Sequence, residues 1–90
     1  MNKAQLIQKL SEKTKLSRHQ SESVIDAALE IIQKTVQTGG EVKLVGFGTF
    51  SAVDRKAKKG RNPRTGQEVD IPGVRLPRFK PGKDFKSRLS

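Results

Sequence analysis

The chain has 90 residues, of which 32% are hydrophobic, and its 19 Lys and Arg against 9 Asp and Glu give a formal net charge of +10. This length suits one domain, and a chain of this size buries only about 60–65% of the surface that its unfolded form exposes. The absence of Cys excludes a disulfide framework, a thiolate zinc site and a cysteine nucleophile, and a single histidine excludes a His-based metal cluster. No apolar run approaches a membrane span, and we expect no secretory signal. The positive charge therefore indicates a polyanionic partner, either nucleic acid or an anionic membrane surface.

The positive charge is unevenly distributed along the chain. Residues 1–45 hold seven basic and five acidic side chains, a net charge of +2. Residues 46–90 hold twelve basic and four acidic side chains, a net charge of +8. A nearly balanced half is typical of a folding scaffold, and a strongly basic half is typical of a binding surface.

The first half predicts two helices joined by a short connection. Asn2 with Gln5 has the spacing of a capping box, and the apolar residues that follow predict a helix over about residues 3–13. Ser17 with Gln20 repeats this spacing and begins a second helix, which the glycines at 39 and 40 end. The apolar stripe of the second helix consists of Val24, Ile25, Ala28, Leu29, Ile32 and Val36.

Two such helices could be a DNA-reading helix-turn-helix or a simple packing pair. A recognition helix needs an exposed basic face. The exposed face of the second helix carries Asp26 and Glu30, which would repel phosphate. We therefore expect the pair to form core or a subunit interface.

The second half predicts a small sheet followed by a short helix. Residues 41–44 alternate as a strand, the glycines at 46 and 48 predict a tight turn, and a second strand follows to about residue 56. Residues 74–80 predict a further strand, in which Pro77 indicates a sheet edge or a bulge. A basic helix is expected over about residues 83–89, with Phe85 and Leu89 on one face.

The stretch from residue 55 to 73 is basic and too polar to bury a core of its own. Pro63, preceded by Asn62 and followed by Gly66, has the composition of a turn. Weak strands on either side, over about residues 54–60 and 67–72, complete an extended basic ribbon. The alternative is a flexible basic linker. We expect the free ribbon to be mobile and to become ordered on binding.

Three separated motifs resemble one known family. They are GFGTF at 46–50, GRNPRTG at 60–66 and FKPGK at 79–83. Together with the Met-Asn-Lys start and the order of elements, they resemble the bacterial HU-type histone-like proteins, the family that includes integration host factor. The resemblance covers essentially the whole chain. This chain departs from common members at Arg78, where a small residue is frequent.

The resemblance implies an α+β fold that forms an intertwined dimer. Residues 1–45 would be the mainly helical dimerisation part, about 54–74 the β-ribbon arm and 82–90 the C-terminal helix of one domain spanning 1–90. The helical base would carry a sheet saddle, and two arms would embrace double-stranded DNA in the minor groove. Pro63 would wedge between base steps and kink the duplex. The resemblance implies a cytoplasmic, nucleoid-associated protein that bends and compacts DNA without strong sequence specificity and prefers bent, nicked or gapped DNA.

Candidate site residues follow from the basic charge and from this resemblance. The residues expected to bind DNA are Lys3, Arg55, Lys56, Lys58, Lys59, Arg61, Asn62, Pro63, Arg64, Thr65, Arg75, Arg78, Lys80, Lys83 and Lys86. The residues expected in the dimer core are Ala28, Leu29, Ile32, Leu44, Phe47, Phe50 and Phe79. Asn62 has two readings, as a minor-groove contact or as a turn residue. We expect no cofactor, no metal site, no membrane contact and no small-molecule substrate.

Three alternatives remain open at this point. The chain could be a subunit like those of integration host factor, with sequence preference and a different partner chain. It could instead be an RNA-binding or ribosome-associated basic protein. An enzyme is the weakest alternative, because the acidic residues are spread singly apart from Glu68 and Asp70 on the basic arm.

Overall fold

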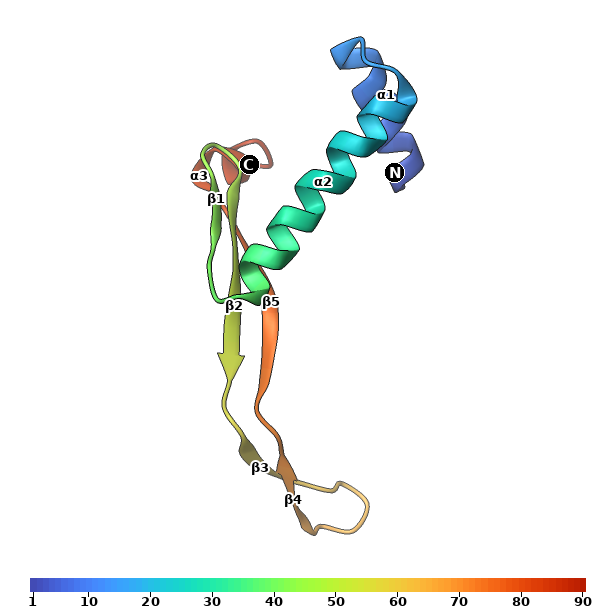
Figure 1. Ribbon diagram of the computed structural model, residues 1–90. Coiled ribbons are helices and arrows are strands. Elements are labelled where there is room, and N and C mark those ends of the chain that lie inside the picture. Colours follow the sequence, from blue (N-terminus) through green and yellow to red (C-terminus); the bar gives the residue numbers. More distant parts are fainter. The chain divides into compact units, whose positions relative to one another are not determined.

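The protein has an α+β fold of three helices and five antiparallel strands, as the sequence predicts (Figure 1). The computed structural model describes residues 1–90. The chain divides into two compact units, Met1–Lys34 and Thr35–Ser90. The boundary falls near the end of a helix, so the first unit holds the first helix and most of the second, and the second unit holds all five strands.

Side-chain caps define the first two helices. Helix α1 spans Lys3–Thr14, and Asn2 and Gln5 exchange hydrogen bonds of 2.9 Å between side chain and backbone in both directions. The helix ends at Lys15, whose φ of 65° is left-handed and whose N–H donates to the Ser11 carbonyl. A lysine in this conformation is uncommon, because the side chain crowds the following carbonyl.

Helix α2 begins with the second predicted capping box and spans Arg18–Gln37. Ser17 and Gln20 exchange hydrogen bonds of 3.0 Å, and the chain leaves the helix through Gly39 at a φ of 92°. Few side chains of the helical unit are buried: Ile7 on α1 and Ser21 on α2. The apolar stripe of α2 is therefore open to water along much of its length.

The larger sheet has the strand order β1-β2-β5, with β2 in the centre. Its strands are β1 (Val42–Leu44), β2 (Gly48–Arg55) and β5 (Val74–Pro81). Pro77 lies on the edge strand β5 opposite Ala52, and the pairing continues unbroken on both sides. The predicted edge position of Pro77 is confirmed, and no bulge is needed because the missing N–H does not face a third strand.

The sheet has one aromatic face and one basic face, because successive side chains in a strand point to opposite sides. Val42, Phe50 and Phe79 form one row across the three strands. Lys43, Thr49 and Lys80 form the neighbouring row, which therefore lies on the other face. This alternation separates the core of the sheet from its charged surface.

A partly exposed phenylalanine cluster holds the second unit together. Phe47 lies in the turn between β1 and β2, and its ring centroid is 5.2 Å from those of Phe79 and Phe85. The centroids of Phe50 and Phe79 are 4.8 Å apart. These are favourable distances for tilted aromatic pairs. The cluster joins the sheet to α3 and fixes the end of the sheet that carries the turn.

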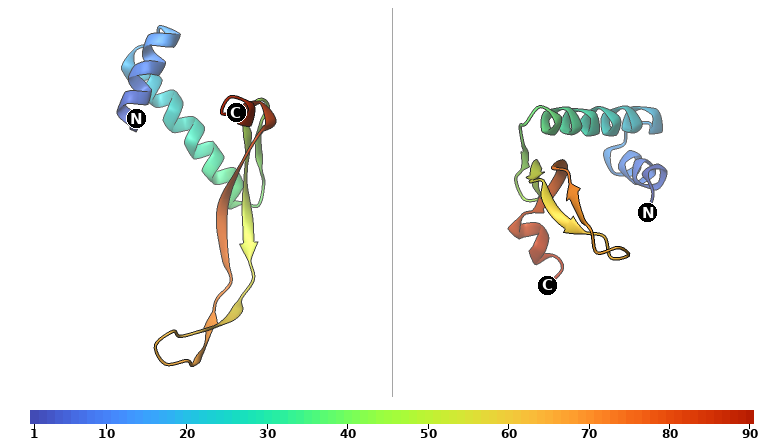
Figure 2. Two further views of the ribbon diagram at one scale, coloured as in Figure 1. Left: turned by 180° about the vertical axis from the view of Figure 1, so that it is seen from behind. Right: turned by 90° about the horizontal axis from the view of Figure 1, so that it is seen from below.

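The basic stretch forms a two-stranded ribbon that continues from β2 and β5 (Figure 2). Its strands, β3 (Lys58–Arg61) and β4 (Glu68–Ile71), are shorter than predicted. The reason is that Asp54 and Arg55 already pair with β5, so the ribbon begins later. The interpretation as an ordered hairpin agrees with the structure, and the alternative of a linker without regular structure does not.

Helix α3 is shorter than the prediction of a C-terminal helix over 82–90. It spans Lys83–Ser87, after which Arg88 N–H donates to the Phe85 carbonyl and Leu89 N–H to the Lys86 carbonyl. These bonds close tighter turns than α-helical ones, so the regular helix stops. Leu89 is 82% exposed and does not share a buried face with Phe85.

Candidate nucleic-acid interface

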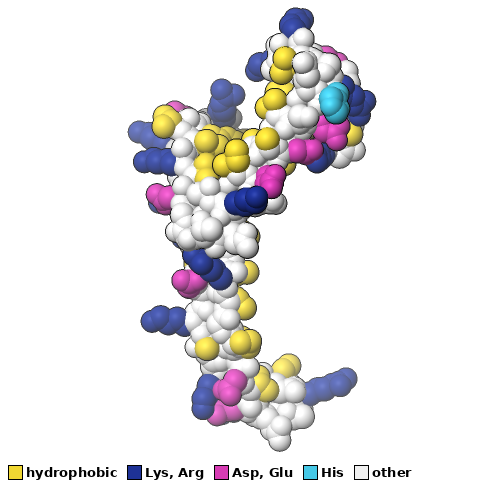
Figure 3. Space-filling model, viewed as in Figure 1, with side chains coloured by type: hydrophobic (Ala, Val, Ile, Leu, Met, Phe, Trp, Pro, Cys, Tyr) yellow, Lys and Arg dark blue, Asp and Glu magenta, His cyan; other side chains and the backbone are white.

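The β3–β4 ribbon displays most of the predicted basic residues in exposed positions. Arg55 ends β2, Lys56 lies in the connection, and β3 carries Lys58, Lys59 and Arg61. Figure 3 shows Lys and Arg side chains projecting at intervals along the strand-containing half. The structure therefore brings the predicted arm residues onto one narrow, solvated element.

The two faces of the ribbon differ in charge. Lys59 lies directly opposite Asp70, and Arg61 lies directly opposite Glu68. The other face pairs Lys58 with Ile71 and Gly60 with Val69. One face thus carries cations faced by carboxylates, and the other is mainly apolar with one lysine.

The tip of the ribbon is a well-defined turn that presents Pro63 to solvent. The Asn62 side-chain oxygen accepts a 2.9 Å hydrogen bond from the Arg64 N–H, and the backbone carbonyl of Asn62 accepts one from the Gly66 N–H at 2.8 Å. Gly66 has a φ of 71°, as the turn prediction required. Thr65 accepts from the Gln67 N–H at 3.3 Å. These bonds give Asn62 a full structural role at the tip.

Strand β5 divides its basic residues between the two faces of the sheet. Arg78 and Lys80 lie on the basic face with Arg55, whereas Arg75 has the same parity as Phe79. The Arg75 guanidinium lies 3.5 Å from the Asp54 carboxylate, its partner across β2. The structure therefore does not place Arg75 with the other predicted DNA contacts.

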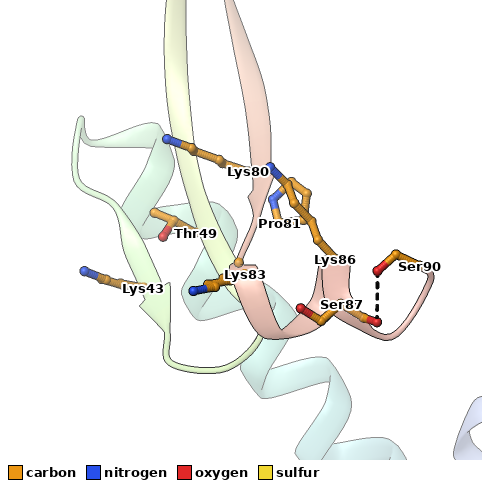
Figure 4. A pocket seen from close by; sticks show the side chains of 9 residues that line it. Lys43, Thr49, Lys80, Pro81, Lys83, Lys86, Ser87 and Ser90 are labelled. Carbon is orange, nitrogen blue, oxygen red and sulfur yellow. Dashed lines mark hydrogen bonds between the residues drawn. The ribbon is translucent and has the colours of Figure 1, made fainter.

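Three predicted lysines come together with one that the sequence analysis missed. Lys80 of β5 and Lys83 and Lys86 of α3 line an open hollow of about 610 Å³ together with Lys43 of β1 (Figure 4). Lys43 belongs to the nearly balanced half of the chain, so the charge distribution did not single it out. Its position opposite Thr49, which itself lies opposite Lys80, is the signal that identifies it.

Lys3 has a carboxylate partner in its own unit. Its Nζ lies 2.6 Å from the Asp26 Oδ1 of α2, and both side chains are about half exposed. The hydrogen bond to Asp26, together with the charge attraction between the two groups, raises the pKa of Lys3. A phosphate approaching Lys3 would therefore compete with Asp26 for the same ammonium group.

Most residues expected in a dimer core are open to water in the single chain. Leu29 is 46% exposed and Phe47 is 42% exposed. Ala28, Leu44 and Phe79 are exposed as well, while Ile32 and Phe50 are half-buried. Soluble monomeric proteins rarely expose this much apolar surface.

The structure shows no cluster suited to a metal ion and no membrane-spanning helix. No group of three or more His, Cys, Asp or Glu side chains is placed to hold a metal ion. No helix combines the length and the apolar character needed to cross a bilayer. The basic ribbon and the basic face of the sheet are thus the surfaces that the structure singles out.

Comparison with known proteins assigns the chain to a family. The sequence profile described as bacterial DNA-binding protein matches residues 1–90. The chain is 44% identical to the DNA-binding protein HU-1 of Halalkalibacterium halodurans, and the alignment covers all of both chains. It is 46% identical to the DNA-binding protein HRm of Rhizobium meliloti, again over the full length of both. The chain belongs to the bacterial DNA-binding protein family, as an HU-type member.

Solved structures agree with this assignment. The Anabaena HU–DNA cocrystal structure matches with a TM-score of 0.91 at 42% identity, covering 100% of this chain and 98% of the other. A V42I mutant of HU from Thermotoga maritima matches with a TM-score of 0.75 at 27% identity, covering both chains completely. The first of these structures contains DNA.

Proposed function

We propose that this protein is a non-catalytic architectural protein that binds double-stranded DNA and bends it. One observation carries the proposal: a narrow basic ribbon presents an exposed proline, Pro63, at a hydrogen-bonded turn. Membership of a family described as DNA-binding supports it, as does the likeness to an HU–DNA complex. The protein would act in the cytoplasm, associated with the nucleoid.

The ribbon suits the minor groove in size and in charge. A two-stranded ribbon is narrow, and a narrow minor groove has a strong negative potential that attracts Arg and Lys. The Asn62 side chain, which could read a base edge, is already held by the turn. Because minor-groove patterns are degenerate as well, we infer binding with little dependence on base sequence.

Pro63 would act as a wedge between base pairs. Its ring is apolar and rigid and has no N–H to leave unpaired, so it can replace part of a base stack. Unstacking a step costs a few kcal/mol, which is offset when the bent duplex meets more protein surface. Such a protein binds already bent, nicked or gapped duplexes more tightly than straight ones, because part of the deformation is made in advance.

A comparison of nucleic acids tests the function as a whole. Gel shifts at one salt concentration with linear, nicked and gapped DNA duplexes and with double-stranded RNA should give the tightest binding to the nicked and gapped DNA. Bending is measured in the same complexes by end-to-end energy transfer. Tighter binding to RNA would favour the ribosome-associated or RNA-binding alternative instead.

Replacing Pro63 with alanine separates bending from affinity. Pro63→Ala is expected to reduce the bend in a linear duplex and to weaken binding to that duplex by up to a few kcal/mol, the scale of one unstacked step. Binding to a nicked duplex should change much less. Pro72→Ala, which alters the proline between β4 and β5, is the matched control and should leave the bend unchanged. Equal losses on both duplexes would argue against a wedge.

We further propose that two copies associate through the exposed apolar residues of each unit. A chain of 90 residues that devotes about 20 to the ribbon has little core left, and association supplies the missing burial. In this arrangement residues 1–45 form the dimerisation part and each copy contributes one arm. A pair with a paralogous chain would use the same residues and is the alternative.

Sedimentation measures this association directly. The protein at micromolar concentration is expected to sediment as a dimer without DNA, because Leu29 and Phe47 then leave water. Leu29→Glu should shift it to monomers or unfold it, since a buried unpaired carboxylate costs several kcal/mol. Gln33→Glu introduces the same carboxylate at an exposed site of the same helix and is the control. A stable folded wild-type monomer would contradict the dimer.

A further inference from the structure

The hollow at the turn end of the sheet has the composition of a phosphate-binding site. Its lining includes four lysines, Lys43, Lys80, Lys83 and Lys86, from three elements that are distant in the sequence. All four are exposed. The ion pairs of the structure are Lys3 with Asp26, Lys34 with Glu30 and Arg75 with Asp54, so none of the four is neutralised by a carboxylate.

The acidic side chain nearest in sequence to these lysines is turned elsewhere. Asp84 precedes Phe85 on α3 but is not among the residues that line the hollow. Its carboxylate instead lies beside Gly46, 3.7 Å from where a β-carbon of that glycine would be. No Asp or Glu side chain lines the hollow, so the four positive charges act on the same volume without an acidic side chain among them.

The register of the sheet holds Lys43 against this group. Lys43 pairs with Thr49, and Thr49 pairs with Lys80, so the three side chains form one row across β1, β2 and β5. Figure 4 shows the amines of Lys43, Lys80 and Lys83 arranged about the Thr49 hydroxyl. An ammonium–hydroxyl–ammonium row offers both charge and a neutral hydrogen-bond donor, which suits a phosphate oxygen.

The geometry points to Lys43 as an additional DNA-phosphate ligand, which completes a four-lysine cradle with Lys80, Lys83 and Lys86. This inference rests on the proposed function, since it names a further contact of the same partner. The cradle lies at the opposite end of β2 from the ribbon. At about 3.3 Å per residue, the 14 residues from Thr49 to Pro63 extend up to roughly 45 Å. The cradle therefore binds duplex that is well removed from the tip.

Lys43→Gln tests the assignment through the salt dependence of binding. Fluorescence anisotropy with a linear duplex of about 40 bp is recorded over a series of salt concentrations. Each phosphate contact contributes about 0.9 to the slope of log affinity against log salt, so Lys43→Gln should lower the slope by about 0.9 for each bound chain. Affinity should fall several-fold at low salt.

Two further variants and the wild type make the outcome unambiguous. Lys9→Gln removes an exposed lysine of α1 that does not line the cradle and should leave the slope unchanged. Lys43→Arg keeps the charge and should retain the wild-type slope.

Equal slopes for Lys43→Gln, Lys9→Gln and wild type, with wild-type binding still steep, would overturn the assignment and leave the proposed function intact. Loss of slope in Lys43→Arg as well would indicate disruption of the strand and would also overturn it. A wild type that does not bind DNA would instead refute the proposed function.

Discussion

Gly48→Ala is expected to destabilise the fold by about 3 kcal/mol, at the upper end of the cost of overpacking. A β-carbon at this position would lie 2.6 Å from the Lys80 carbonyl oxygen and 2.6 Å from the Phe79 ring. Neither neighbour can move freely, because the carbonyl belongs to the paired strand β5 and the ring belongs to the phenylalanine cluster. Thermal unfolding should show a midpoint lower by roughly 12–24 °C.

The glycine at the ribbon tip is the matched comparison. Gly66 has open space around it but a φ of 71°, so Gly66→Ala adds backbone strain without a clash. We expect a loss of about 1 kcal/mol from this variant. Both variants are compared with wild type by chemical denaturation with the same two-state analysis. A smaller loss for Gly48→Ala than for Gly66→Ala would show that β5 and the cluster can relax, contrary to the tight approach of β2 and β5.

DNA affinity is expected to fall by about 10³–10⁵ between 50 and 200 mM salt, as for proteins that contact six to ten phosphates. The physical reason is the release of counterions when Lys and Arg neutralise phosphates. Six to ten contacts correspond to a slope of about −5 to −9 in log affinity against log salt. Titrations of one duplex at several salt concentrations provide the measurement.

A control measurement must show that salt does not unfold the protein. Circular dichroism across the same salt series should show constant helix content, so that a fall in affinity cannot come from unfolding. A slope near zero would mean that phosphates are not the main ligands. The electrostatic basis of the proposed function would then fail, whatever the behaviour of Pro63.

Local signals predicted the helices of this protein well. The two capping boxes, Asn2 with Gln5 and Ser17 with Gln20, depend on residues three apart, and both form as expected. The turn at the tip could also be predicted from the sequence, because Asn62, Pro63 and Gly66 each have strong conformational preferences. The end of α3 could not be predicted in this way, since no glycine, proline or cap marks the residue after Ser87.

Long-range register was the information that the sequence analysis lacked. Lys43 joins its lysine partners only through the pairing of β1 with β2 and of β2 with β5, and no local pattern indicates that pairing. The sequence alone does indicate that Arg75 lies on the aromatic face of the sheet. It shares the parity of Phe79, which was expected in the core, whereas Arg78 and Lys80 have the opposite parity. Counting alternate residues along the strand separates these side chains.

The carboxylates on the ribbon bear on how readily DNA is released. Asp70 and Glu68 lie opposite Lys59 and Arg61 in the register of the ribbon, so each carboxylate is a nearby negative charge that is covalently attached. Unlike dissolved ions, they cannot be released into solution when a phosphate approaches, and that entropy gain is forgone at these two positions. Under the proposed function, the arm binds DNA less tightly than its number of cations suggests. Release of DNA from the arm would be faster for the same reason.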